Sequence, residues 1–96
     1  MTAYVDRLES YGNKRWCHLI ADSAAELHAI AQRCGLKREW FQDSPPASCP
    51  HYDAQPRIRA LLIKAGAVEC LTRSVFVEHV RRIRDIPAVV WEGRTA

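Results

Sequence analysis

The chain has 96 residues, of which 48% are hydrophobic and 26% charged, and its formal net charge is +3. This length allows one domain with a modest core and excludes a second domain. The small positive charge favours anionic over cationic partners, but it is too weak to indicate nucleic acid on its own.

Membrane and secretory signals are not visible in the sequence. No apolar run approaches the roughly 18 residues of a membrane span. The first residues, MTAYVDRLES, lack the basic segment and the apolar run of a secretory signal. The four cysteines are widely and irregularly spaced, which argues against a disulfide framework. We therefore expect a soluble, cytoplasmic protein without a membrane partner.

Two β-strands are predicted at the start of the chain. Residues 3–7 (AYVDR) favour extended structure, and Gly12-Asn13 in the following loop is a turn signal. Residues 16–21 (WCHLIA) are apolar except for His18, a pattern typical of a strand that is covered on both faces. We expect this second strand at the centre of the sheet.

A helix over residues 23–34 follows the second strand. Ser23 and Glu26 match the capping box, in which each side chain satisfies a backbone N–H group of the first turn. Apolar residues then recur at helical spacing, and Gly35 is typical of the residue that ends a helix.

The middle of the chain continues this alternation. Residues 37–43 predict a short helical turn, and the proline-rich segment 44–50 predicts a loop. Apolar residues at helical spacing between 58 and 65 predict a second helix, and residues 67–71 (AVECL) predict a third strand.

A third helix is predicted near the C-terminus. Thr72 or Ser74 can cap it, and Pro87 ends it. Residues 88–96 are compatible with an edge strand or a tail. The order of these elements predicts a small single-domain α/β fold over residues 1–96, with three helices and a mainly parallel sheet of three to four strands.

The predicted fold also predicts where a site lies. Ligands of open parallel sheets bind beyond the carboxyl ends of the strands, where loops and helix N-termini converge. Asp6 and Asp22 end the first two predicted strands, and Thr72 with Arg73 ends the third. We therefore expect the acidic residues to meet at one edge of the sheet.

The segment before the second helix adds titratable groups to this edge. His51 titrates near neutrality and is the expected general acid or base. Tyr52 can donate a hydrogen bond to an anionic oxygen, and Arg59 offers a planar fork of donors for phosphate or carboxylate. Asp53 has an alternative interpretation as the cap of the second helix.

The remaining histidines have different expected roles. His18 interrupts an apolar strand, and a buried imidazole needs a hydrogen-bond partner. His18 is therefore either a structural core histidine, held by a backbone carbonyl or a nearby carboxylate, or a catalytic or ligand-binding residue. His28 is expected at the boundary of the core, and His79 at the surface. The candidate catalytic residues are His51 and His18, and the candidate ligand-binding residues are Asp6, Asp22, Tyr52, Asp53 and Arg59.

Metal binding has weak support in the sequence. Asp6 and Asp22 offer oxygen ligands of the kind that magnesium prefers. Two cysteine–histidine pairs offer ligand types that zinc prefers, but no C-x-x-C or H-x-x-x-H element accompanies them. These pairs are Cys49 with His51 and Cys17 with His18. No cofactor is identified from these patterns, and no metal site is assigned.

Three functional hypotheses remain open. The leading hypothesis is a pocket that binds, and as an enzyme acts on, a phosphate-bearing small molecule such as a nucleotide. The alternative is a non-catalytic interaction module whose third helix binds nucleic acid or a protein through Arg81, Arg82 and Arg84. The third is a small structural zinc domain.

Several short motifs resemble a known family. They are YVD at 4–6, CHLIAD at 17–22, EL at 26–27, WFQ at 40–42, HYD at 51–53, Arg59 and AGAVE at 65–69. Together they resemble domain of unknown function 4031, a family of short bacterial and phage proteins, over about residues 3–72. The resemblance implies no established activity. Members commonly carry a second acidic residue after YVD, where this chain has Arg7, which argues against a carboxylate-rich metal site. Residues 73–96, the expected C-terminal helix and tail, lie outside the resemblance.

Overall fold

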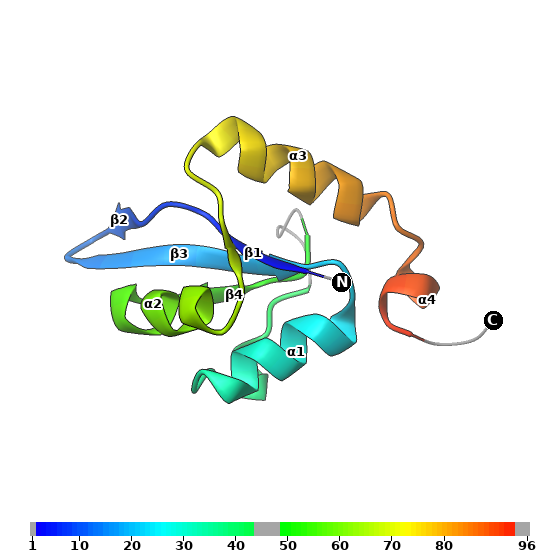
Figure 1. Cartoon of the computed structure of the whole chain (residues 1–96), viewed down its shortest axis with the longest axis horizontal. Helices are drawn as coiled ribbons and strands as arrows, with labels where there is room; N and C mark the ends of the chain where they lie inside the picture. The colour runs from blue at the N-terminus through cyan, green and yellow to red at the C-terminus, as the bar shows by residue number, and fades with distance from the viewer. Residues whose placement is uncertain (1, 44–48, 94–96) are drawn as a thin grey trace.

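Strand β3 (Lys14–Ala21) is the centre of the sheet, because three other strands pair with it. The computed structural model describes residues 2–43 and 49–93. Within this part of the chain, one mixed sheet of five strands lies between helices on its two faces (Figure 1).

Strands β1 (Ala3–Val5) and β2 (Glu9–Tyr11) pair with successive parts of β3, and both are antiparallel to it. A two-residue turn joins β2 to β3. Gly12 has a φ of 68° in this turn, a conformation that glycine adopts without steric strain. The turn signal in the sequence therefore marks a β-hairpin.

Strands β4 (Tyr52–Ala54) and β5 (Val68–Glu69) complete the sheet. β4 is antiparallel to β3 and lies on the side of β3 opposite β1, because Leu19 faces Val5 on one side and Tyr52 on the other. β5 is parallel to β1. The strands β1, β4 and β5 therefore run in one direction, and β3 runs in the other.

The expectation of a mainly parallel sheet is not confirmed. Among the strands of the described residues, only the β1–β5 pair is parallel. The physical reason lies in the connection between the first two predicted strands. A connection between parallel strands needs a dozen or more residues. The tight turn at Gly12 has only two residues, so β3 runs antiparallel to β2.

The three predicted helices are present. Helix α1 (Ala24–Arg33) begins after Ser23, whose hydroxyl accepts a hydrogen bond from the backbone N–H of Glu26 at 3.2 Å. Helix α3 (Arg73–Arg84) begins after Thr72, whose hydroxyl accepts from Val75 N–H. Both caps follow the sequence prediction. Helix α2 (Pro56–Lys64) begins after Gln55, so the interpretation of Asp53 as its cap is wrong.

Two short helices add to this set. The 3₁₀ turn η1 (Arg38–Trp40) lies within the predicted turn at 37–43. Helix α4 (Ala88–Trp91) replaces the strand or tail expected after Pro87. Most of the predicted loop at 44–50 and the last three residues of the chain lie outside the described residues.

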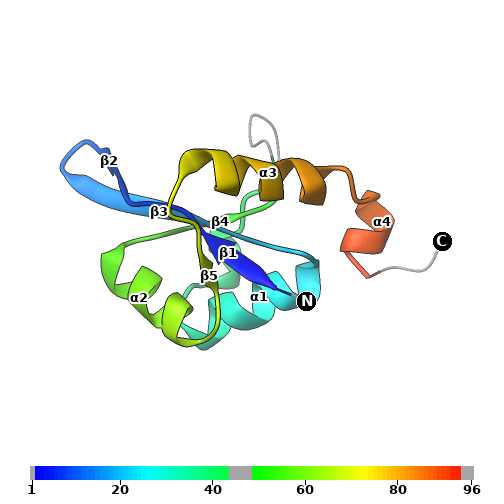
Figure 2. The same cartoon turned by 45° about the horizontal axis from the view of Figure 1, so that its top comes forward.

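Helix α3 covers one face of the sheet, and α1 and α2 cover the other, as the views in Figures 1 and 2 agree. The layer between the sheet and helices α1 and α2 contains several of the largest fully buried side chains, including Leu19 and Tyr52 of the sheet, Leu27 of α1 and Leu62 of α2. The face toward α3 carries polar residues as well as Ile20 and Phe76. No helix in residues 2–43 and 49–93 has the length and apolar character of a membrane span.

Candidate functional site

Three polar residues form a row across adjacent strands on the α3 side of the sheet. Asp6 follows β1 directly, and its backbone N–H donates to the carbonyl of His18 on β3. His18 is in turn the cross-strand partner of Asp53 on β4. Cross-strand partners carry their side chains on the same face of a sheet. The strand pairing therefore places the three side chains next to one another.

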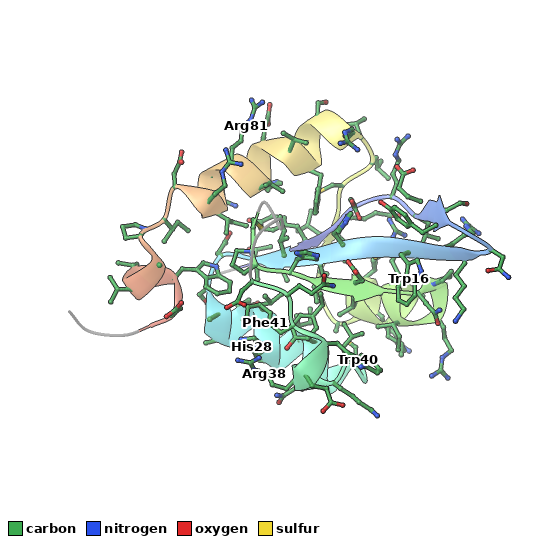
Figure 3. The ribbon with its side chains drawn as sticks, turned by 180° about the vertical axis from the view of Figure 1, so that it is seen from behind. Trp16, His28, Arg38, Trp40, Phe41 and Arg81 are labelled. Carbon is green, nitrogen blue, oxygen red and sulfur yellow. The ribbon has the colours of Figure 1, made fainter. Side chains whose placement is uncertain are left out.

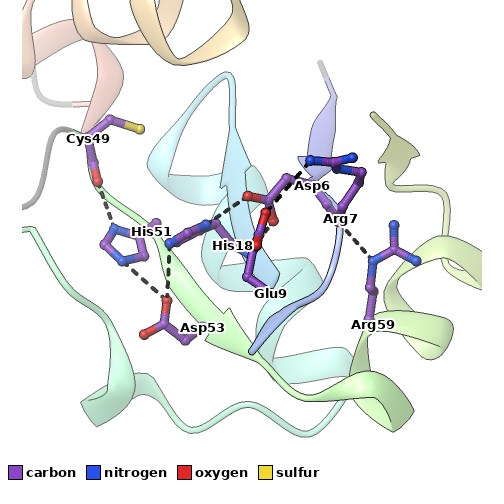
Figure 4. A network of polar contacts seen from close by, with 8 residues as sticks. All are labelled: Asp6, Arg7, Glu9, His18, Cys49, His51, Asp53 and Arg59. Carbon is purple, nitrogen blue, oxygen red and sulfur yellow. Dashed lines mark hydrogen bonds and ion pairs between the residues drawn. The ribbon is translucent and has the colours of Figure 1, made fainter. Parts of the chain in front are cut away.

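His51 joins this row from the start of β4. It lies two residues before Asp53, and residues at this spacing in extended chain point to the same face. His51 Nε2 is 3.4 Å from Asp53 Oδ1, and His18 Nε2 is 4.0 Å from the same oxygen. Figure 4 shows both imidazoles converging on this carboxylate. We call His18, His51 and Asp53 the His–Asp cluster.

Hydrogen bonds fix the tautomer of each imidazole in the cluster. His18 Nδ1 is 2.8 Å from Asp6 Oδ2, and His51 Nδ1 is 2.9 Å from the carbonyl oxygen of Cys49. A carbonyl or ionised carboxylate only accepts hydrogen bonds, so both Nδ1 atoms carry the proton and donate it. The Nε2 atom of each ring therefore faces Asp53, as an acceptor when the ring is neutral and as a donor when the ring is protonated.

The surroundings shift two pKa values in the cluster. The hydrogen bond to Asp6 raises the pKa of His18 above its ordinary value, although burial opposes this. Hydrogen bonding from protonated His51, reinforced by the hydrogen bond that Gln42 donates to Asp53 Oδ2 at 2.8 Å, lowers the pKa of Asp53, although burial opposes this. Asp53 is therefore an anion at neutral pH.

A cavity of about 470 Å³ lies between α3 and the sheet, beside the cluster. We call it the α3 cavity. Asp6, His18 and His51 lie on its sheet side, and one face of α3 forms the opposite wall. Its full lining is Asp6, Arg7, Glu9, His18, Ile20, Cys49, His51, Arg73, Phe76, Val77, Val80, Arg81 and Arg84.

The α3 wall of this cavity is cationic. Arg73, Arg81 and Arg84 line it, and none of them forms an ion pair with another residue of the described chain. Arg7, in contrast, lies 3.8 Å from Glu9, and Arg82 pairs with Asp22 outside the cavity. The three α3 arginines therefore have donors available for an external anion.

A second, smaller hollow lies beside the cluster, next to Trp16 of β3. It measures about 350 Å³, and we call it the Trp16 cleft. Its lining consists of Tyr11, Trp16, His18, Gln42, His51 and Asp53. All three residues of the His–Asp cluster therefore border a space that is open to solvent.

The family of the chain follows from comparison of its sequence with family models. The model described as "Protein of unknown function (DUF4031)" matches residues 3–84, which is most of the chain. The chain belongs to the DUF4031 family. The DUF4031 match extends past residue 72, where the motifs in the sequence placed its end, and includes α3 up to Arg84. Comparison with curated proteins and with solved structures finds no match.

Four of the seven predicted site residues meet in this DUF4031 structure: Asp6, His18, His51 and Asp53. Asp22 does not join them, because it follows the carboxyl end of β3, and β3 runs opposite to β1. Asp22 instead accepts hydrogen bonds from the Tyr4 hydroxyl and from Arg82. The expected meeting of Asp6 and Asp22 at one edge is therefore wrong.

Tyr52 and Arg59 lie on the other side of the sheet. Tyr52 alternates with its neighbours along β4 and is fully buried, with its hydroxyl 2.8 Å from His28 Nδ1. Arg59 on α2 donates from Nε to the carbonyl of Asp6 and from its guanidinium to Glu69. Both side chains hold the fold together, and neither lines the α3 cavity. The expectation that they contact the ligand does not fit this geometry.

The other histidines are placed close to their expected positions. His28 is partly buried at the edge of the core and packs edge-on against Phe41, at 4.7 Å between ring centroids. Figure 3 shows this pair on the α1 side, away from Arg81 on α3. His79 is also partly buried, because its ring stacks on Tyr4 at 3.9 Å. It is thus less exposed than a surface residue.

The cysteine–histidine pairs considered for zinc do not form. Cys17 and His18 are neighbours in a strand, so their side chains point to opposite faces. Burial raises the pKa of the Cys17 thiol to about 12 and that of Cys49 to about 11. Both thiols stay protonated at neutral pH, which also disfavours them as nucleophiles.

Sequence reasoning assigned no ligand-binding role to two residues around the site. Gln42 orients Asp53, and Arg73, which was named only at the end of the third predicted strand, is the third arginine that α3 contributes to the cavity wall. A signal was present for both. Gln42 belongs to the WFQ motif, and Arg73 lies two helical turns before Arg81, which places both arginines on one face of α3.

Proposed function

We propose that the α3 cavity binds a phosphate-bearing small molecule such as a nucleotide. The observation that carries this proposal is the set of three arginines on one helix face, Arg73, Arg81 and Arg84, which line one cavity without carboxylate partners. Guanidinium groups bind phosphate oxygens through paired hydrogen bonds. The free donors of these side chains therefore favour an anion with several oxygens.

The charge balance inside the α3 cavity supports an anionic ligand. Its lining holds four arginines and two carboxylates. The two carboxylates, Asp6 and Glu9, already contact His18 and Arg7. A phosphate group would compensate the cations that remain.

The apolar part of the cavity supports a ligand with more than a phosphate. Phe76, Val77 and Val80 of α3 and Ile20 of β3 form this part of the wall. The volume of about 470 Å³ lies within the range of about 300–1,000 Å³ that is common for small-molecule sites. A nucleobase or another flat apolar group can occupy the space next to these side chains while the phosphate meets the arginines.

The general acid or base role expected for His51 remains a prediction. Its Nε2 is the ring atom available for proton transfer, because Nδ1 donates to Cys49. The proposal made here concerns binding, and it needs no reaction.

Calorimetric titration with nucleoside mono-, di- and triphosphates and with inorganic phosphate tests the proposal. We expect saturable 1:1 binding of a nucleotide that is stronger than binding of phosphate alone. The Arg81→Ala and Arg84→Ala variants should each bind roughly 10- to 100-fold more weakly, because a hydrogen bond to a charged group contributes about 1.5–3 kcal/mol. Binding should also weaken as salt rises.

Arg33→Ala is the matched control. Arg33 is exposed at the end of α1, on the other side of the sheet, and its loss should leave binding unchanged. Equal affinity of the wild type and the Arg81→Ala/Arg84→Ala double variant would refute the site.

The interaction-module hypothesis uses the same helix and needs its own measurement. Salt-sensitive binding of a DNA or RNA oligonucleotide that requires the α3 arginines, with no binding of mononucleotides, would replace the proposal with that alternative. The third arginine of that hypothesis, Arg82, pairs with Asp22 and the Tyr4 hydroxyl, so it is less available than Arg81 and Arg84.

A further inference from the structure

Three possible metal-ligand atoms converge in the His–Asp cluster. The Nε2 atoms of His18 and His51 both face Asp53 Oδ1, at 4.0 and 3.4 Å. Both rings carry their proton on Nδ1, because Asp6 and the Cys49 carbonyl accept it there. In the neutral rings, the two Nε2 atoms and one carboxylate oxygen therefore offer three ligand atoms at a shared position.

Such an arrangement is stabilised by a cation at the shared position. Acceptors that face one another repel unless a proton or a metal ion lies between them. A proton on Nε2 of either ring joins that ring alone to the carboxylate. A metal ion binds all three at once.

The donor set and its spacing fit a transition-metal ion. One ligand atom from each of the three residues lies within 4.8 Å of the other two. In a tetrahedral zinc site, with metal–ligand distances of about 2.0–2.1 Å, ligand atoms lie roughly 3.3 Å apart. The contact between His51 and Asp53 already has this length, whereas His18 Nε2, at 4.0 Å from the same oxygen, has to move closer when the ion binds.

Ligand chemistry separates the candidate metals. Imidazole nitrogen suits zinc, iron, cobalt and nickel, whereas calcium and magnesium prefer sites made of oxygen ligands. Two histidines with one carboxylate form a three-ligand set that leaves coordination positions for water or substrate. All three residues border the Trp16 cleft, so solvent or a substrate can approach the cluster from that side.

The surrounding residues have the geometry of an outer shell around a metal site. Metal-binding histidines usually donate their other ring N–H to a carboxylate or a backbone carbonyl, which orients the ring. His18 does so to Asp6, and His51 does so to Cys49. Gln42 holds the second oxygen of Asp53, which leaves Oδ1 directed at the imidazoles.

We propose that His18, His51 and Asp53 bind one divalent transition-metal ion, such as Zn²⁺, through His18 Nε2, His51 Nε2 and an oxygen of Asp53. Asp6 is a positioning residue that orients His18. On this inference, His51 serves as a metal ligand and not as a general acid or base. The inference does not depend on the proposed phosphate ligand, because the α3 arginines contribute no metal ligand.

Titration of the metal-free protein tests the site. The full chain, prepared without a polyhistidine tag and stripped with a chelator, is titrated with Zn²⁺ by calorimetry and with Co²⁺ by visible absorption. We expect one equivalent to bind, and a cobalt spectrum without thiolate charge-transfer bands. Zn²⁺ should also raise the midpoint of thermal unfolding, since a ligand of the native state stabilises that state.

Substitution of the proposed ligands tests which residues bind the metal ion. His51→Gln and Asp53→Asn should abolish stoichiometric binding, and Asp6→Asn should weaken it by about 10- to 100-fold, as expected for an orienting residue. His79→Gln is the matched control, because His79 lies against Tyr4 outside the cluster and should bind Zn²⁺ as the wild type does. Circular dichroism of each metal-free variant verifies that it is folded.

Several results would overturn the inference. They are a wild type that binds neither metal at stoichiometric concentration, a folded Asp53→Asn variant with unchanged affinity, and a cobalt spectrum showing thiolate ligation. Nucleotide titrations in the presence of chelator keep the two proposals apart. If nucleotide binding persists there while Zn²⁺ fails to bind, only the metal site is refuted, and the reverse result refutes only the phosphate site.

Discussion

Each histidine in this chain lies beside a different partner, and the partner determines what the ring can do. Asp6 and the Cys49 carbonyl direct the rings of His18 and His51 toward Asp53. The Tyr52 hydroxyl instead bonds to His28 Nδ1 on the opposite side of the sheet. Two rings thus direct Nε2 at one carboxylate, while a third contacts a core tyrosine.

A pH dependence of stability follows from His28. Burial, reinforced by nearby Arg38 and opposed by Asp43, lowers the pKa of His28 below its ordinary value of about 6.5. The unfolded chain therefore takes up a proton at this residue at higher pH than the folded chain does. The contribution of His28 to stability is complete above about pH 6.5 and decreases as the pH falls through that value.

Urea unfolding of the wild type and of His28→Asn at pH 7.0, 6.0 and 5.0 measures this contribution. Asparagine keeps an acceptor for the Tyr52 hydroxyl but does not titrate, so the variant should lose less stability on acidification than the wild type. The comparison isolates His28 from the other histidines. Parallel pH profiles for the two proteins would show that His28 does not titrate as inferred.

At the scale of elements, the helices begin where short side chains can satisfy the first backbone N–H groups. Ser23 and Thr72 both accept a hydrogen bond from the residue three positions later. The hairpin of β2 and β3 has an equally local cause, the positive φ of Gly12. These boundaries are therefore encoded within a few residues of sequence.

Removal of the cap of α1 should destabilise the protein. Ser23→Ala deletes the acceptor for the Glu26 N–H group, and we expect the free energy of unfolding to fall by about 1 kcal/mol. Denaturant unfolding monitored by circular dichroism measures the change. Ser10→Ala, at an exposed position of β2 that caps no helix, is the control. A loss no greater than that of the control would show that the cap contributes nothing to stability.

At the scale of the whole molecule, helix α4 connects the C-terminal region to β3, the central strand of the sheet. Trp91 of α4 is buried, and its indole N–H donates to the carbonyl of Ala21 at the end of β3. Arg82 ties α3 to the same end of the sheet through Asp22 and Tyr4. The hydrogen bond between Trp91 and Ala21 thus joins two segments that are 70 positions apart in the sequence.

Loss of this closing contact should have a large effect. Trp91→Ala removes a buried aromatic ring and one hydrogen bond, and we expect the free energy of unfolding to fall by about 3–5 kcal/mol. Such a loss is a large part of the 5–15 kcal/mol total that is typical of small domains.

The neighbouring residue provides the control for this measurement. Val90 belongs to the same short helix but is exposed, so Val90→Ala should change stability by less than about 0.5 kcal/mol. A Trp91→Ala variant as stable as Val90→Ala would mean that α4 is not fastened to the sheet in solution.

The sequence identified candidate residues for the site, but it did not show which of them meet in the fold. His18, a polar residue in an apolar strand, and His51, after a proline-rich loop, both stand out in the sequence. Asp22 and Arg59 stand out equally, yet they bind Arg82 and Glu69 instead. Local sequence does not show that Asp22 and Arg59 lie outside the site, because the residues that bind them are ten to sixty positions away.

The sequence by itself determined the three longer helices, the caps of α1 and α3, the strands β1, β3 and β5 and the turn at Gly12, because these features depend mainly on interactions within about four residues. Strands β2 and β4 lie outside the predicted strands. Only the tertiary structure decided the direction and register of the strands. The register sets His18 opposite Asp53 and Asp6, and the antiparallel direction of β3 carries Asp22 to the far end of the sheet. Backbone pairing between strands distant in sequence fixes both properties, and the face on which each side chain lies follows from them.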